Sequence, residues 1–210
     1  MKHSIDYNAL DARARALMEK REAHGIWRER GSIYFHGART AAGVVALRKR
    51  IFPDDASRDD ALKIAAMFHD IGKGIEPHER YGAALFREAV ADLLLPDMIG
   101  ICASMIASHC DRRPNEAVYD PWARLLQDAD VLDHFGSYQV WMDVYYASAD
   151  QSPPRTLIEG FYAGEYDKLK MDLRALLNYP ESIKIFDEKT AFSDAWIERF
   201  KIEMNGGYIV

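Results

Sequence analysis

Cysteine is scarce in this sequence, because only Cys102 and Cys110 occur in 210 residues. Two cysteines cannot form the disulfide framework of a small secreted domain, and their spacing differs from the paired CxxC arrangement of a zinc site. We therefore expect a reducing, cytoplasmic setting in which both side chains are buried as small apolar residues.

Long apolar runs and basic clusters are also absent. No stretch of 18 apolar residues occurs, and the first ten residues contain His, Asp and Asn where a signal peptide has a continuous apolar stretch. The 27 basic residues are outnumbered by 33 acidic ones, the net charge is −6, and no basic cluster is long enough to follow a phosphate backbone. We therefore expect neither a membrane nor a long nucleic acid as a partner, and the oligomeric state stays open.

Glycine and proline are modest in number, at 13 and 8, whereas apolar residues make up 49% and charged residues 29% of the chain. This composition disfavours disorder and low complexity and is typical of a globular protein. The length suits one domain with a well-buried core. We expect a single domain over residues 1–210, with a core over residues 31–150 and a C-terminal helical extension over residues 155–210 that packs back on it.

Apolar residues recur at helical spacing through almost the whole chain, and alternating strand patterns are hard to find. The sequence therefore predicts an all-α fold. The expected helices follow apolar stripes at residues 10–21, 33–51, 62–66, 81–93, 98–105, 162–176 and 192–204, with a further helix that begins near Pro121 and has room to be long.

Capping and turn-forming residues separate these helices. Asp6 is expected to cap the first helix, and the run from Ser57 to Asp60 has the pattern of a capping box at the start of the third. Pro77 is expected to open the fourth helix and Pro96 to end it. The segment from Gln151 to Pro154 is the clearest interruption before the C-terminal part.

Three histidines, His36, His69 and His109, each continue the apolar face of a separate predicted helix. Asp70 follows His69 directly, and Asp130 lies on the apolar side of another helix. A single histidine on such a face is more often a core residue than a ligand. Several buried polar groups would each cost on the order of 1–3 kcal/mol without a partner, and one cation can satisfy them together. The pattern therefore predicts a metal site, and its mixture of imidazoles and carboxylates suits Mn, Fe, Co, Ni or Zn better than Ca.

Three segments in this order resemble the signature of the HD-domain metal-dependent phosphohydrolases: His36, the segment from Phe68 to Lys73 with the sequence FHDIGK, and the segment from Asp128 to Asp133 with the sequence DADVLD. The resemblance covers about residues 31–136, and residues 161–207 are loosely similar to the C-terminal helices of small bacterial HD nucleotide pyrophosphatases. It implies an all-α HD-type domain in which one divalent metal is bound by His36, His69, Asp70 and Asp130.

The resemblance also extends to two further histidines. In HD proteins with two metals, residues at places like those of His78 and His109 hold the second ion, with the aspartate at the place of Asp70 as a bridge. The alternative is that His78 and His109 contact substrate phosphate directly. One or two ions are therefore expected.

The function that the resemblance implies is hydrolysis of a phosphoester or phosphoanhydride in a small phosphorylated molecule, with a nucleotide favoured. A bound metal would place positive charge on the phosphate oxygens and lower the pKa of its water. We assign candidate catalytic roles to Asp70, Lys73 and Asp133, although a structural salt bridge explains Asp133 equally well. The candidate substrate-binding residues, chosen for their charge near the predicted ligands, are Arg39, Lys73, Arg112 and Arg113.

Two other functions are compatible with the same residues. Some HD proteins use two irons to activate oxygen, and this chain resembles them at six positions: His36, His69, Asp70, His78, His109 and Asp130. A di-iron oxygenase is therefore the second hypothesis. A nucleotide sensor that keeps its metal ligands without turnover is the third.

Asp128 and Asp130 compete for one ligand position. A helix advances by about 100° per residue, so these two side chains point roughly 200° apart and cannot both reach the same ion. The apolar face of the helix and the family resemblance both favour Asp130 as the ligand. Asp128 is then expected to support the site indirectly or to lie on the surface.

Overall fold

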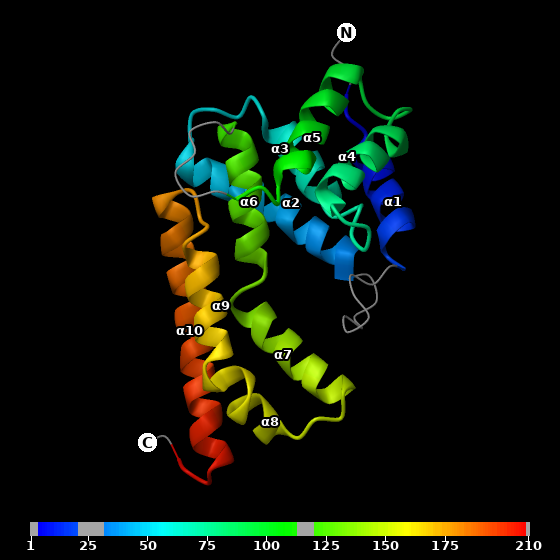
Figure 1. Ribbon diagram of the computed structural model, residues 1–210. Helices are drawn as coiled ribbons and strands as arrows, with labels where there is room; N and C mark the ends of the chain where they lie inside the picture. Colours follow the sequence, from blue (N-terminus) through cyan, green and yellow to red (C-terminus); the bar gives the residue numbers. More distant parts are fainter. Residues whose placement is uncertain (1–3, 21–31, 113–119, 209–210) are drawn as a thin grey trace. The chain divides into compact units, whose positions relative to one another are not determined.

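The computed structural model describes residues 4–20, 32–112 and 120–208, and these residues form an all-α structure without strands (Figure 1). This confirms the predicted fold class. The chain forms two compact units, residues 1–130 and 131–210, which we call the N-terminal and C-terminal units. The single domain over residues 1–210, and the packing of its C-terminal helices on the core, stay predictions.

Helices of the N-terminal unit are, in order, α1 (Tyr7–Met18), α2 (Ser32–Ile51), α3 (Asp59–Phe68), α4 (His78–Ala89) and α5 (Pro96–Ser108), followed by most of α6 (Pro121–Asp133). The C-terminal unit contains the end of α6, then α7 (Ser137–Ala149), α8 (Pro154–Glu159), a 3₁₀ turn (Phe161–Ala163), α9 (Glu165–Arg174) and α10 (Pro180–Met204). None of the described helices has the length and apolarity that crossing a membrane requires.

Helix α3 forms the centre of the N-terminal unit. It packs against α2 on one side and α5 on another, and α1 contacts both α2 and α3. Its residues from Ile64 to Phe68 are buried without interruption. This run of apolar residues places the end of α3, which His69 and Asp70 follow, inside the unit.

Gly37 allows α2 to lie directly against α3. A Cβ atom at this position would lie 2.5 Å from the backbone oxygen of Met67, which is closer than real contacts allow. The preceding residue is His36, so this close approach brings its helix next to the one that ends at His69. A glycine in the second predicted helix therefore has a packing reason.

One of the two expected helix caps is present and the other is not. Asp6 does cap α1, since its Oδ1 accepts a hydrogen bond from the backbone N–H of Ala9. The capping box expected from Ser57 to Asp60 was wrong, because α3 begins after Arg58 without a side-chain cap. Asp59 instead pairs with the guanidinium of Arg48 at 2.6 and 2.7 Å.

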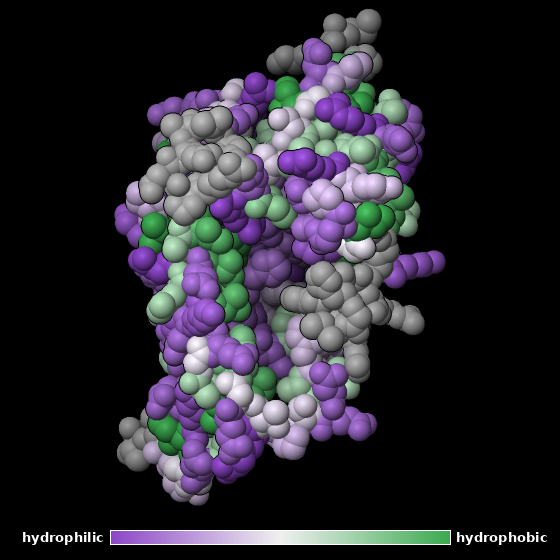
Figure 2. All heavy atoms as spheres, in the orientation of Figure 1, coloured by the Kyte–Doolittle hydropathy of each residue, from purple (hydrophilic) through white to green (hydrophobic). Residues whose placement is uncertain are grey.

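The helix that begins at Pro121 ends at Asp133 instead of running on. Gly136, with a φ angle of 86°, precedes the new helix α7. Glycine adopts this left-handed conformation at little cost, so the break has a local cause. On the face shown in Figure 2, hydrophilic side chains predominate and apolar atoms are exposed in small groups, as expected of a chain with 29% charged residues.

Asp143 on α7 is a largely buried carboxylate that accepts hydrogen bonds from Tyr162 at 2.8 Å and from Gln139 at 3.1 Å. Burial raises its pKa to about 6, although the two hydrogen bonds oppose the shift. A raised pKa means that the folded state favours the protonated acid. Its contribution to stability is therefore complete below the unfolded pKa, near 3.8, and is lost as the pH rises through about 6.

Replacing Asp143 with Asn should raise the free energy of unfolding at about pH 8 by roughly 1–3 kcal/mol, because the ionised carboxylate no longer has to be buried. The gain should disappear near pH 3.5, where the acid is protonated in both states. Urea unfolding at the two pH values measures the difference. An equal gain at both would show that ionisation is not its cause.

Candidate metal centre

Six side chains meet inside the N-terminal unit, and we call them the His–Asp cluster. None of the six residues is more than 8% exposed. They come from α2, the two residues after α3, the start of α4, the residue after α5, and α6: His36, His69, Asp70, His78, His109 and Asp130. The structure thus brings together the six residues that the sequence singled out as candidate ligands.

The first half of the cluster contains His36, His69 and Asp130. The Nε2 atom of His36 lies 3.0 Å from Asp130 Oδ1 and 3.1 Å from His69 Nε2. His69 Nε2 is 3.6 Å from the same Asp130 oxygen and 3.8 Å from Asp70 Oδ2. Two imidazole nitrogens and two carboxylates therefore converge on one small volume.

The second half of the cluster is built around the other oxygen of Asp70. Asp70 Oδ1 lies 3.4 Å from His78 Nε2 and 3.5 Å from His109 Nε2. Since Oδ2 faces His69, the carboxylate has one oxygen toward each half of the cluster. A carboxylate in this position is able to bridge two ions.

Backbone carbonyls orient two of the imidazoles. His69 Nδ1 lies 2.7 Å from the oxygen of Ala66, and His109 Nδ1 lies 2.7 Å from the oxygen of Ile106. A carbonyl only accepts, so Nδ1 donates in both rings. Both histidines directly follow the last residue of a helix, where carbonyls lack intrahelical partners. In the neutral ring, this hydrogen bond leaves Nε2 as the nitrogen with a free lone pair for a metal.

Gly72 allows the loop after Asp70 to lie directly against the start of α4. A Cβ atom there would lie 2.2 Å from the backbone oxygen of His78 and 2.5 Å from the backbone nitrogen of Gly82. The loop after Asp70 therefore packs directly on the first turn of α4. This packing places His78, the first residue of α4, at the cluster.

Charges within the cluster shift the pKa values in opposite directions. Burial alone would raise the pKa of Asp70, but His69, His109, His78 and Lys73 hold it well below its usual range. Burial lowers the pKa of His69, which therefore favours the neutral ring. Asp70 is thus a permanent anion inside the unit.

His78 and His109 behave differently from His69. The hydrogen bond to Asp70, with a further one to Cys110, raises the pKa of His78 to about 10. Burial lowers the pKa of His109, but Asp70 and Cys110 raise it to about 10 overall. Without an ion, these two imidazoles are protonated and face Asp70. Positive charge is therefore favoured at the place where a cation would bind.

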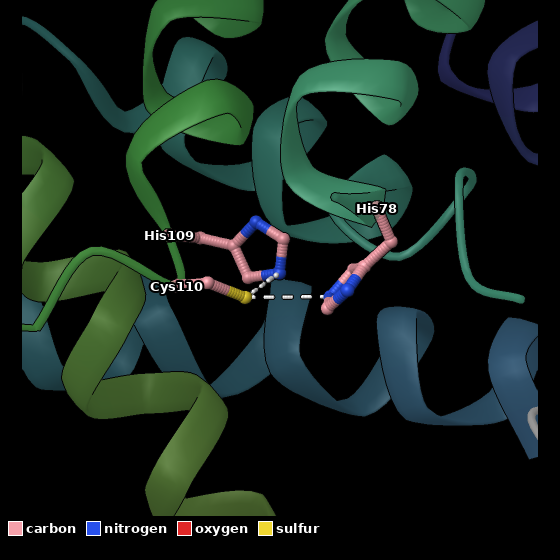
Figure 3. A group of neighbouring side chains, drawn as sticks. All are labelled: His78, His109 and Cys110. Atoms are coloured by element: carbon pink, nitrogen blue, oxygen red, sulfur yellow. Dashed lines mark hydrogen bonds between the residues drawn. The ribbon is translucent and has the colours of Figure 1, made fainter. Parts of the chain in front are cut away.

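Cys110 is a cluster neighbour that the sequence analysis missed. It is exposed, so the expectation that both cysteines are buried was wrong for this one, while Cys102 is buried. Its Sγ points toward two imidazoles, 3.3 Å from His78 Nε2 and 3.2 Å from His109 Nε2 (Figure 3). Burial of the thiol raises its pKa, but these imidazoles lower it to about 7. Its only sequence signal was its position next to His109.

Two of the predicted cationic residues lie at the cluster. Lys73 Nζ is 3.4 Å from Asp70, and a guanidinium nitrogen of Arg112 donates a hydrogen bond to Asp130 Oδ2. Arg39 is half-buried one turn beyond His36 on α2. Arg113 lies outside the described residues.

Two acidic residues flank Asp130 on α6. Asp128 is only 1% exposed, so the alternative that it lies on the surface was wrong. Asp133, proposed from sequence as a catalytic group, is half-buried one turn beyond Asp130 and belongs to the C-terminal unit.

The residues present fit a transition metal. The cluster offers carboxylate oxygens and imidazole nitrogens, and the Nδ1 atoms of His69 and His109 already donate to backbone carbonyls. Several sets of three side chains have ligand atoms within 4.8 Å of one another, among them His36, His69 and Asp70; His69, His109 and Asp130; and His78 and His109 with Cys110. Nitrogen and oxygen donors of this kind suit Mn, Fe, Co, Ni or Zn.

Residues 36–134 match the HD domain family, a range that contains the whole His–Asp cluster. This segment of the chain is therefore an HD domain. A comparison with curated proteins gave no match.

Solved structures are similar to the chain over nearly its whole length. A protein described as a predicted HD superfamily hydrolase, from an uncultured Thermotogales bacterium, is 16% identical with a TM-score of 0.65, over 97% of this chain and 96% of that one. An HD-superfamily hydrolase from Bacillus thuringiensis is 18% identical with a TM-score of 0.65, over 94% and 96%. YpgQ of Bacillus subtilis, solved in complex with ADP, is 18% identical with a TM-score of 0.62, over 94% and 98%. The likeness establishes a shared helical fold.

Proposed function

We propose that this protein is a metal-dependent phosphohydrolase that cleaves a phosphoester or phosphoanhydride bond in a small molecule, with a nucleotide as the favoured substrate. The observation that carries the proposal is the position of Asp70, with one oxygen toward His69 and the other toward His78 and His109. The complex of YpgQ with ADP supports a nucleotide.

In this proposal, one ion is held by His36, His69, Asp70 and Asp130, and a second by Asp70, His78 and His109. When bound, such ions supply positive charge to phosphate oxygens and lower the pKa of a bound water. The protein contributes the orientation of the ligands, because the carbonyls of Ala66 and Ile106 fix two of the rings.

The cations beside the cluster have two tasks. Arg112 donates to the Asp130 oxygen that faces away from His36 and so orients that carboxylate. Lys73 lies 3.4 Å from Asp70 and is 24% exposed in its side chain, so its ammonium is within reach of an anion that approaches from solvent. We infer that Lys73 attracts and neutralises the substrate phosphate.

A panel assay tests the function. Metal-free protein is supplied with Mn, Fe, Co, Ni, Zn or Mg and incubated with nucleotides and phosphoesters, under air and under nitrogen. The expected result is release of phosphate or pyrophosphate that requires a transition metal and is unaffected by oxygen. Binding of nucleotide without turnover of any substrate would instead indicate a sensor.

The geometry also supports a second candidate, a di-iron oxygenase. A carboxylate between two groups of histidines is an arrangement that suits a pair of irons as well as a pair of hydrolytic ions. Consumption of oxygen by the iron-loaded protein, without phosphate release under nitrogen, would favour this function over hydrolysis.

The two halves of the cluster should differ in how pH affects metal binding. An ion must displace protons from His78 and His109, whose pKa values are raised to about 10, whereas the pKa of His69 is lowered and its ring is already neutral. As pH falls from about 9 to about 5, the ion at His78 and His109 should therefore be lost first.

Metal content after equilibrium dialysis measures this prediction, and calorimetry in buffers of different ionisation enthalpy counts the protons released. Two steps of metal loss, with the larger proton release for the weaker ion, are expected. Loss of all metal in a single step would contradict the difference between the two halves.

A further inference from the structure

The second half of the cluster contains four donor atoms, namely one oxygen, two nitrogens and one sulfur: Asp70 Oδ1, His78 Nε2, His109 Nε2 and Cys110 Sγ. The Asp70 oxygen lies 3.4 and 3.5 Å from the two nitrogens, and the sulfur lies 3.3 and 3.2 Å from the same nitrogens. Both imidazoles therefore have an oxygen and a sulfur as neighbours at nearly equal distance.

We propose that Cys110 is a ligand of the ion held by Asp70, His78 and His109, and that this position takes a thiophilic divalent ion such as Zn²⁺, Co²⁺ or Fe²⁺. Thiolate is a soft ligand, whereas Mg²⁺ is bound mainly through oxygen. The cysteine thus selects the ion. This inference deepens the proposed function and rests on it.

Four of the separations between these donors are close to the edges of a tetrahedral site. Metal–nitrogen bonds of about 2.0–2.1 Å and metal–sulfur bonds of about 2.3 Å place neighbouring nitrogens about 3.3 Å apart, and a nitrogen and a sulfur about 3.6 Å apart. The observed separations of 3.2 to 3.5 Å differ from these edges by only a few tenths of an ångström. Each imidazole therefore lies at a suitable distance to share an ion with the carboxylate on one side and with the thiolate on the other.

The two cysteines have clearly different surroundings. Cys102 is buried on α5, and its thiol lies 3.5 Å from the backbone oxygen of Ala61, which is an ordinary core contact. Cys110 is exposed and follows the end of α5, yet its sulfur faces the imidazoles (Figure 3). Packing in the core explains the position of Cys102. The orientation of Cys110 is explained by the two imidazoles that its sulfur faces.

Titration with Co²⁺ tests the proposal, because a thiolate bound to Co²⁺ gives a ligand-to-metal charge-transfer band in the near ultraviolet. The wild-type protein should show this band, and Cys110→Ser should lose it. The control Cys102→Ser should retain it. In Cys110→Ser, Zn²⁺ binding at this position should weaken by about 100-fold. Loss of a group that only supports a metal ligand costs up to about 100-fold in affinity, and loss of a direct ligand is expected to cost at least as much.

A second variant and a second measurement guard against a misfolded serine variant. Cys110→His should keep the second ion, because imidazole is also a ligand, but should lose the sulfur band. In the wild type, bound Zn²⁺ should slow alkylation of Cys110 by iodoacetamide about tenfold or more, as mapped by mass spectrometry.

The outcomes separate this inference from the proposed function. Two ions bound without a sulfur band, and equally in Cys110→Ser, would overturn the role of Cys110 and leave the metal-dependent hydrolase intact. Failure of the wild type to bind any of the three ions would overturn both.

Discussion

Replacing Asp70 with Asn should lower the proposed phosphohydrolase activity by about 10³-fold and reduce bound metal to less than one ion per chain. The amide keeps the volume of the carboxylate but removes its charge and one of its two acceptor oxygens. Because one oxygen faces His69 and the other faces His78 and His109, both halves of the cluster lose a donor at once.

Asp92→Asn is the matched control, because Asp92 is an exposed carboxylate of the same unit that pairs with Arg13 at 3.0 Å. It should leave activity and metal content unchanged. Metal analysis of both purified variants, with circular dichroism to verify the helices, gives the result. Full activity in Asp70→Asn would mean that the His–Asp cluster is not the reaction site.

The local sequence pattern was sufficient for the all-α fold and for five residues of the cluster, whereas His78 was assigned only through the family resemblance. Histidines such as His36 and His109 lie on the apolar stripes of their helices, so the same periodicity that predicts burial also predicts that they point inward. His69 and Asp70 directly follow α3, whose last five residues are buried without interruption. Burial of several polar groups then required a common partner.

Interactions beyond the helices were not accessible to the same reasoning. Cys110 follows α5, where the apolar periodicity has ended, and its partner His78 is 32 residues away. Arg112 meets Asp130 through a loop, and no periodic pattern fixes where a loop points. The wrong capping box has a similar cause, since Arg48 on α2 holds Asp59 in an ion pair that only the packing of the two helices creates.

Asp130 and Asp128 offer the sharpest test of how α6 faces the cluster. Both residues are buried, at 7% and 1% exposure, so burial alone cannot distinguish a ligand from a structural carboxylate. The distances can, because Asp130 Oδ1 lies 3.0 Å from His36 Nε2 and 3.6 Å from His69 Nε2. Residues two apart on a helix point roughly 200° apart, which turns Asp128 away from that ion.

Asp130→Asn should therefore release the ion held with His36 and His69 and lower activity by about 10²-fold or more, while Asp128→Asn should keep its metal. Because Asp128 is fully buried, its replacement is expected to act on thermal stability instead. Metal content, activity and the unfolding midpoint of the two variants, measured side by side, distinguish these effects. The reverse order, with metal lost only from Asp128→Asn, would mean that the other face of α6 meets the imidazoles, and the assignment of Asp130 would have to be abandoned.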